Sequence, residues 1–182
     1  MSQNQISPVE KNQININKTK KEENFIKTNR IKQLDLDRNN EIEIFKKSFL
    51  INSDSSLKPK IYSKNFLNKG LYTGELTKEG IRHGIGMFSF KQNDDVYCGE
   101  WENDIFHGSG TYYYSSGDKY EGEIFKGMKE GNGRYYFKNG NFYEGDWKNN
   151  LKDGQGKMEY KTRNEVYDGW FYFFIVLFIL KL

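Results

Sequence analysis

Aromatic and small or polar residues alternate in short runs through the middle of the chain. In the run YCGEW, residues 97–101, the two aromatic rings and the glycine point to one face of an extended strand, while Cys98 and Glu100 point to the other. A second alternating run, TYYY, follows at residues 111–114, and a polar SSGD turn comes directly after it. This arrangement predicts a β-hairpin.

The hairpin pattern recurs along the chain at an almost constant interval. Successive units start at tyrosines that are 25, 23, 23 and 24 residues apart. A fixed period of this length is typical of repeat proteins, in which each unit buries its apolar face only against its neighbours. A lone hairpin is marginally stable at best in water, so we expect the units to stack into one sheet. The starting tyrosines are Tyr72, Tyr97, Tyr120, Tyr143 and Tyr167.

Glycines accompany these tyrosines at fixed distances. A glycine in the middle of each first strand is expected to leave a hollow for an aromatic ring of the adjacent unit. Two more glycines stand where the loop enters the second strand, because a residue without Cβ permits a positive φ and close packing there. Together with the tyrosines and two tryptophans, the predicted structural positions are Tyr72, Gly74, Gly84, Gly86, Tyr97, Gly99, Trp101, Gly108, Gly110, Tyr120, Gly122, Gly131, Gly133, Tyr143, Gly145, Trp147, Gly154 and Gly156.

The pattern as a whole predicts an all-β fold, an elongated single-layer antiparallel meander of about eight strands. Upstream of it, FLNKGLY at residues 66–72 is similar to YFKNGNFY at residues 136–143, which indicates half of a degenerate capping unit. The N-terminal part is rich in Asn, Gln, Lys and Ser, so we expect it to be disordered. The predicted bounds are 1–60 for this polar arm, 61–71 for the half-repeat cap, 72–96, 97–119, 120–142, 143–166 and 167–170 for the units of the array (72–170), and 171–182 for an apolar tail.

One stretch of the polar arm, residues 34–50, is denser in apolar residues than the rest. Ile42, Phe45 and Phe49 share one face of a helix, whereas the letters LDLD and IEIF alternate as a strand would. We favour a short docking helix over a strand for this stretch.

The apolar tail, FYFFIVLFILKL, interrupts the fifth unit. Its apolar stretch is shorter than the about 20 residues that a membrane-spanning helix needs, so we do not expect a single pass. Three interpretations stay open for the tail: a short interfacial anchor, a last strand buried on the array, or translated noncoding sequence, since its residue types have A/T-rich codons.

Composition and charge disfavour several classes of protein. Aromatic residues make up 16% of the 182-residue chain, and its single cysteine rules out an internal disulfide. The net charge of +3 divides unevenly, because residues 1–60 carry 12 Lys or Arg against 8 Asp or Glu, and residues 61–170 carry 15 against 17. A mildly acidic array disfavours nucleic acid as a partner. The first residues lack an apolar h-region, so we expect a cytoplasmic protein that is not secreted.

Two segments carry a resemblance to a known family. YEGEIFKGMKEGNGRYYFKNGNF and YEGDWKNNLKDGQGKMEYKTRNEV resemble MORN repeats, whose unit is close to Y-E-G-x-W-x-x-G-x-x-x-G-x-G, and the match covers residues 72–170. The first unit departs from the pattern, because Leu76 replaces Trp and one extra residue precedes Gly84. The resemblance implies a scaffold in cytoskeletal, ciliary or membrane-contact assemblies. It also implies two other roles found in the family, phosphoinositide recognition and the regulation of lipid-kinase or methyltransferase domains.

An acidic residue recurs three positions after each starting tyrosine. A regular row of this kind is expected to face lysine partners across the ladder, and a catalytic carboxylate pair is disfavoured because no cleft is implied. No catalytic residue is predicted. The row consists of Glu75, Glu100, Glu123 and Asp146.

The histidines and the cysteine are interpreted as structural residues. His83 and His107 stand where other units carry Glu130 and Asp153, so they are polar turn residues, and we expect no metal and no cofactor. Cys98 has no nearby histidine and is expected to be a small packing residue.

Some rings alternate out of phase with the inward set. Tyr113, Tyr136 and Phe142 are expected to be partly exposed near the basic residues of the third unit. A phosphoinositide headgroup could be held there, with Lys and Arg on the phosphates and rings at the interface, although a solvated polar rim is favoured. The candidate anionic-lipid patch consists of Lys126, Lys129, Arg134 and Lys138.

These inferences favour a non-enzymatic scaffold whose open groove and exposed edges bind other proteins. Unpaired terminal strands make a homo-oligomer a further expectation. The alternatives are a membrane adaptor that binds anionic phospholipids such as phosphoinositides, and the regulatory fragment of a lipid-kinase-type enzyme. The expected location is the cytoplasm, in association with the cytoskeleton or a membrane.

Overall fold

The computed structural model of the 182-residue chain describes residues 29, 32–33, 35–47, 61–66 and 69–172. The chain divides into two compact units, residues 1–40 and 41–182. The described residues of the first compact unit are helical. Of the two alternatives for residues 34–50, helix and strand, the structure has a helix at residues 35–47. The predictions for residues 1–28, 48–60 and most of the tail, 173–182, lie outside the described residues.

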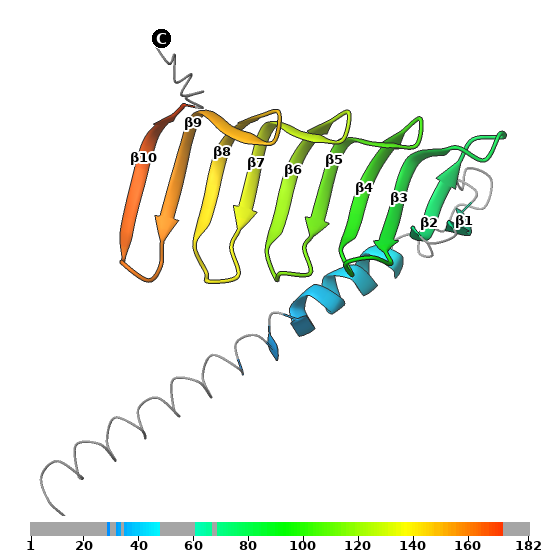
Figure 1. The fold of residues 1–182 in the computed structure, drawn as a ribbon, viewed down its shortest axis with the longest axis horizontal. Coiled ribbons are helices and arrows are strands. Elements are labelled where there is room, and N and C mark those ends of the chain that lie inside the picture. The colour runs from blue at the N-terminus through cyan, green and yellow to red at the C-terminus, as the bar shows by residue number, and fades with distance from the viewer. Residues whose placement is uncertain (1–28, 30–31, 34, 48–60, 67–68, 173–182) are drawn as a thin grey trace, which may run out of the picture. The chain divides into compact units, whose positions relative to one another are not determined.

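The second compact unit, residues 41–182, contains a ten-stranded antiparallel sheet in which each strand pairs with its neighbours in the sequence (Figure 1). This single-layer meander confirms the predicted fold class. The capping segment and the fifth unit each add a strand to the eight expected from four hairpins. The strands are β1 (Ile61–Phe66), β2 (Gly70–Leu76), β3 (Arg82–Phe90), β4 (Val96–Glu102), β5 (Ile105–Tyr113), β6 (Lys119–Phe125), β7 (Met128–Tyr136), β8 (Phe142–Lys148), β9 (Leu151–Tyr160) and β10 (Glu165–Phe171).

The turns differ between the two edges of the sheet. Along one edge, two-residue turns join the strands of a unit, and both residues have positive φ, as with 52° and 67° at Asn103 and Asp104. Two successive positive φ angles are typical of the type I′ hairpin turn, which Asn, Asp and Gly tolerate best. The first repeat unit, residues 72–96, has a longer loop instead, closed by a hydrogen bond of 2.8 Å from the Thr77 N–H to the Ile81 carbonyl. This loop accommodates the extra residue before Gly84.

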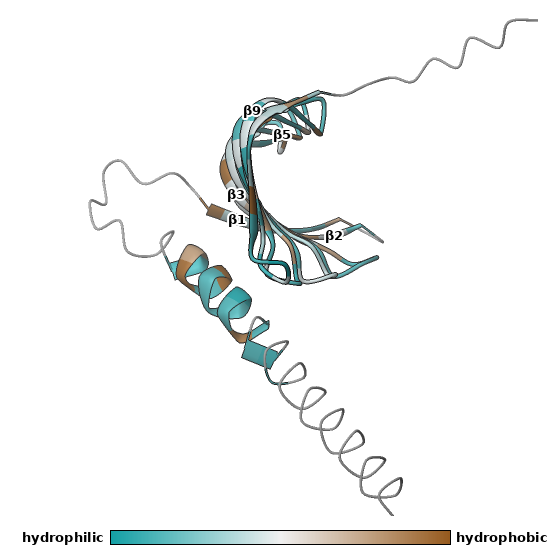
Figure 2. Cartoon of the chain, turned by 90° about the vertical axis from the view of Figure 1, so that its left-hand side faces the viewer, coloured by the Kyte–Doolittle hydropathy of each residue, from teal (hydrophilic) through white to brown (hydrophobic). Residues whose placement is uncertain are grey.

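The starting tyrosines of the four complete units are fully buried. Each hydroxyl donates to the carbonyl oxygen three residues ahead in its own strand, at 2.7 Å for Tyr72 to Glu75 and 2.9 Å for Tyr97 to Glu100. A ring that reaches a carbonyl of its own strand lies along the inner side of a bend, and the end-on view in Figure 2 shows the sheet curved into a C. We call the face that carries these tyrosines the concave face. Burial raises the pKa of all four hydroxyls, so they remain donors at neutral pH.

A row of glycines crosses the sheet beneath the tyrosine rings. An ideal Cβ added to Gly133 would lie 2.5 Å from the Tyr120 hydroxyl, and one added to Gly122 would lie 2.5 Å from the Gly133 Cα. The hollow above each glycine pair is thus filled by the tyrosine of the same unit. The prediction that an adjacent unit fills it is wrong. Paired in register from strand to strand, the row is Gly74, Gly86, Gly99, Gly110, Gly122, Gly133, Gly145, Gly156 and Gly169.

Trp101 and Trp147 join neighbouring units on the concave face. The Trp101 ring stands edge-on between Tyr72 and Tyr97, with centroids 5.3 and 5.4 Å away, and its Nε1 donates to the Gly86 carbonyl at 3.1 Å. Trp147 bonds the Gly133 carbonyl in the same way at 3.1 Å. Trp101 thus joins the first and second units and Trp147 the third and fourth. Ile124 stands at the equivalent position of the third unit, and all three residues belong to one buried cluster.

Polar residues join the turns at the other edge. Asp118 accepts hydrogen bonds from the Tyr135 hydroxyl at 3.0 Å and from the Lys138 N–H at 2.8 Å, both in the following hairpin. Asp95 makes the equivalent bonds to the Tyr112 hydroxyl and the Ser115 N–H, at 2.9 and 2.7 Å. Each turn is therefore held by the turn that precedes it.

A smaller apolar cluster lies on the opposite face of the sheet. Tyr113 is 7% exposed, and its hydroxyl donates to Glu41 at 2.9 Å, so the expectation that this ring is exposed is wrong. Burial raises the pKa of the Cys98 thiol to about 12, which keeps it protonated at neutral pH. The buried members of the cluster are Ile42, Met87, Val96, Cys98 and Tyr113.

Replacing a glycine of the row should destabilise the array. We expect Gly133→Ala to lower the free energy of unfolding by about 1–3 kcal/mol, because its Cβ would overlap the Tyr120 hydroxyl. Urea unfolding of the full chain measures the change. Asn132→Ala is the matched control, since its exposed side chain lies on the other face and the substitution keeps the backbone N–H that bonds Glu123. Equal stability of the two variants would contradict the role given to the glycine row.

Candidate functional site

The acidic row has partners other than the predicted lysines. Glu123 accepts a hydrogen bond of 2.9 Å from the Asn132 N–H on the next strand, beside Gly131, whose φ is 65°. Each carboxylate thus holds the irregular start of its second strand. The predicted pairing with lysines across the ladder is wrong for this row. The other bonds are Glu75 to Ile85 N, Glu100 to Ser109 N and Asp146 to Gln155 N, at 2.9, 2.9 and 2.8 Å.

Cations lie over aromatic rings on the concave face. The Arg82 guanidinium is 4.3 Å from the Trp101 centroid, and the Lys152 Nζ is 4.7 Å from the Tyr143 centroid. These residues and Lys129 occupy equivalent positions in three units, and the second unit has Phe106 there. This set of inward cations was not predicted from the sequence. The signal was present, because alternation counted back from the aromatic residues of each second strand places all four positions inward.

Lys129 is enclosed by rings from its own unit and from both neighbouring units. Its Nζ lies 4.7 Å from the Trp147 centroid, 4.9 Å from Tyr135, 5.4 Å from Tyr120 and 5.7 Å from Tyr114. Burial lowers the pKa of Lys129, and the positive charge of Lys152 lowers it further. The ammonium group lies over these ring faces, and its Nζ also donates a hydrogen bond of 3.4 Å to the Tyr114 hydroxyl.

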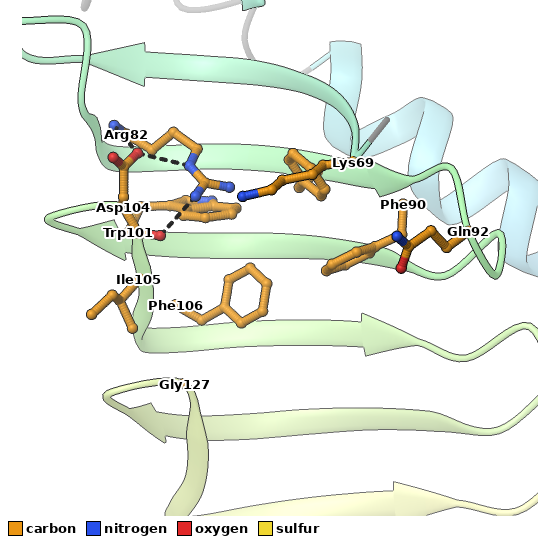
Figure 3. A pocket seen from close by; sticks show the side chains of 10 residues that line it. Lys69, Arg82, Phe90, Gln92, Trp101, Asp104, Ile105, Phe106 and Gly127 are labelled. Carbon is orange, nitrogen blue, oxygen red and sulfur yellow. Dashed lines mark hydrogen bonds and ion pairs between the residues drawn. The ribbon is translucent and has the colours of Figure 1, made fainter. Parts of the chain in front are cut away.

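A pocket of about 480 Å³ opens on the concave face between the first two complete units (Figure 3). The Arg82 guanidinium lies at one side, where its Nε donates to Asp104 Oδ1 and its Nη2 to the Asp104 carbonyl, both at 2.9 Å. Burial opposes the charge on Asp104, but the hydrogen bonds from Arg82 lower the pKa of that carboxyl. We call this the Trp101 pocket; its walls include Lys69, Arg82, Phe88, Phe90, Trp101, Ile105 and Phe106.

The structure does not bring the four residues of the candidate lipid patch together. Lys126 and Lys138 lie in the turns at opposite ends of β7, and the side chain of Lys129 lies among rings on the concave face. Arg134 points to the opposite face, where its Nη2 forms an ion pair of 2.6 Å with Glu144. These four positions therefore belong to two faces and two edges.

His107 is not among the residues that line the Trp101 pocket. His107 lies 3.3 Å from Glu102 through its Nδ1, and its ring is 5.2 Å from that of Phe125. Within the described part of the chain, no three His, Cys, Asp or Glu side chains are grouped as a metal site requires.

Comparison with known families identifies the repeat. A family model described as the MORN repeat matches residues 72–94, 97–119, 120–142 and 143–165, which is just over half of the chain. The chain belongs to the MORN repeat family. The resemblance found in the sequence is thereby confirmed, and the four matched segments correspond to the hairpins from β2 to β9. No curated protein matches the chain.

Membership of the MORN repeat family indicates the general kind of module that the array forms. MORN repeats are generally non-catalytic and indicate a repeat-type module for protein interaction or membrane association. Among the described residues, no helix has both the length and the apolar character needed to cross a bilayer.

The acidic row should contribute to stability through its hydrogen bonds to backbone. We expect Glu123→Ala to lower the free energy of unfolding by about 1 kcal/mol, because the Asn132 N–H loses its acceptor. Glu123→Gln retains an acceptor oxygen and should lose clearly less. Urea unfolding separates the two variants, and equal losses would show that charge, and not this bond, is what matters.

In addition to burial, the charge of Lys152 should lower the pKa of Lys129, its neighbour on the concave face. We expect the pKa of Lys129 to lie below its usual range and to rise in Lys152→Met, which removes the nearby positive charge. A pKa lowered in the folded state means that protonation of Lys129 opposes folding, so this contribution is relieved as the pH rises through the folded pKa. NMR titration of the lysine side chains measures the shift. An unchanged pKa in Lys152→Met would contradict the coupling.

Proposed function

We propose that this MORN array is a non-enzymatic scaffold whose concave face binds other proteins. The observation that carries the proposal is the Trp101 pocket. This pocket has aromatic walls with space between them. Pockets with mainly apolar walls and a few polar groups are typical binding sites.

Exposed apolar side chains beside the pocket support a protein partner. Ile105 lines the pocket and is 46% exposed, although it contributes little to the buried core of the array. A partner protein can bury such a side chain without disturbing the core of the array. The buried side chain would add hydrophobic contact to the interface.

The competing proposal of a phosphoinositide adaptor has less support. It depends on Lys126, Lys129, Arg134 and Lys138 acting on one headgroup, and these residues lie on two faces and at two edges. The cellular setting that we propose is a cytoskeletal, ciliary or membrane-associated assembly in the cytoplasm. It rests on family membership alone, as does the alternative of a regulatory segment attached to an enzyme.

Peptide selection on the full chain tests the proposal. We expect peptides from a random 12-residue phage library to bind the concave face, and Ile105→Ser to weaken the selected peptides by about tenfold, because it removes apolar contact at the pocket. Fluorescence anisotropy with the synthesised peptides measures the affinities. Leu151→Ser is the matched control, since Leu151 occupies the equivalent repeat position two units away and is 37% exposed. Selected peptides that bind both variants like the unmodified chain would overturn the proposal.

A further inference from the structure

The Trp101 pocket lies where the second unit departs from the other three. The first, third and fourth units each place a cation over aromatic rings of the concave face, through Arg82, Lys129 and Lys152. In the second unit, Phe106 packs against Tyr97 with a centroid distance of 4.1 Å. The pocket therefore has an additional apolar wall and no lysine stem of its own unit across it.

Two cations at the pocket retain hydrogen-bonding capacity. The Lys69 side chain is exposed and lines the pocket, and it forms no ion pair or side-chain hydrogen bond with any residue that the structure describes. Arg82 uses its Nε and one Nη2 hydrogen on Asp104, so its Nη1 hydrogens stay available within the described region. Two cations face one carboxylate here, and an added carboxylate would balance the charge.

The rest of the array also directs positive charge toward the concave face. The repeated carboxylates, such as Glu100 and Glu123, accept bonds from their own backbone, and their side chains alternate to the opposite face from the tyrosines. The cations at the equivalent inward positions lie over rings instead of pairing with these acids. An acidic segment is thus the complementary partner for a face that belongs to a mildly acidic array.

The orientation of the rings argues against single-stranded nucleic acid. Base stacking needs open ring faces, but the Arg82 guanidinium covers the Trp101 ring at 4.3 Å. Phe90 meets Phe88 at 73° and Phe106 at 74°, so these rings present edges to one another around the space. Such ring edges offer no open face on which a base can stack, whereas an aliphatic or aromatic side chain can pack against them.

We propose that the Trp101 pocket anchors an acidic segment of a partner protein that carries a bulky apolar residue next to a carboxylate. The apolar side chain enters the pocket and packs against the edges of Phe90 and Phe106, and the carboxylate accepts hydrogen bonds from Lys69 and Arg82. This inference rests on the proposed function, because it assigns a partner chemistry to the same pocket.

The test uses the full chain and three probes. The first is a fluorescein-labelled 12-residue peptide with Leu-Phe flanked by Asp and Glu, the second is its twin with Asn and Gln in place of the acids, and the third is a 20-nucleotide oligo(dT). The acidic peptide should bind about tenfold more tightly than its amide twin, and the difference should shrink as NaCl rises from about 0.05 to 0.5 M.

Variants connect the binding to the pocket. Lys69→Gln should weaken the acidic peptide several-fold and leave the amide twin unchanged. Lys78→Gln, an exposed lysine in the loop before β3, is the matched control and should change neither. Thermal unfolding of each variant confirms that the fold is kept.

The outcomes separate this inference from the proposed function. If library-selected peptides respond to Ile105→Ser but are neutral and insensitive to Lys69→Gln, the concave face binds proteins and the acidic chemistry is overturned. If the oligonucleotide binds more tightly than the acidic peptide and depends on Lys69, the inference is also overturned, in favour of nucleic acid. If selected peptides ignore Ile105→Ser, the proposed function itself fails.

Discussion

The hydroxyl of each repeated tyrosine, bonded to a carbonyl of its own strand, is the constraint on which the rest of the array depends. The bond draws the ring down along the strand, and a ring in that position can only lie on residues that have no Cβ. This explains why the glycines are paired across nine strands and not merely present in each. Once the rings are laid flat on the glycine row, the strands bend around them and one face of the sheet becomes concave. A single layer of sheet thereby obtains a core without a second layer to cover it.

That geometry determines where each other residue of the unit can act. Glycine at the start of the second strand adopts a positive φ, and the acidic residue of the first strand bonds the backbone beside it, so the acid has a structural task on the outer face. Inward positions two residues before the first loop glycine place long side chains over the rings. In three units the long side chain is a cation whose charge meets ring faces, as for Lys129 and Trp147. The concave face is therefore aromatic and positive, even though the array contains more acidic than basic residues.

The sequence was sufficient for the fold because period-two alternation and a nearly constant interval between tyrosines both survive in every unit. It also assigned the inward tyrosines and tryptophans correctly, since parity alone decides the face. Parity does not give the direction in which a ring leans, so the pairing of Tyr120 with the glycines of its own unit was missed. Lys129 and Arg134 look alike as letters in a basic run, yet they differ in parity and lie on opposite faces. The pocket could not be foreseen from composition, because it depends on how Phe106 leans against Tyr97.

Departures from the repeat are where individual function can arise in such an array. A residue that every unit shares is needed to build the sheet, so changing it alters stability everywhere it is copied. Phe106 in place of a cation leaves the contacts that build the sheet intact, because Tyr97 still packs against Trp101 and against Phe106 itself. The same exchange removes one charge, adds an apolar wall and leaves the Arg82 guanidinium facing open space. Specific binding by a repetitive surface therefore requires a unit that breaks the repetition, and the second unit does so next to Arg82.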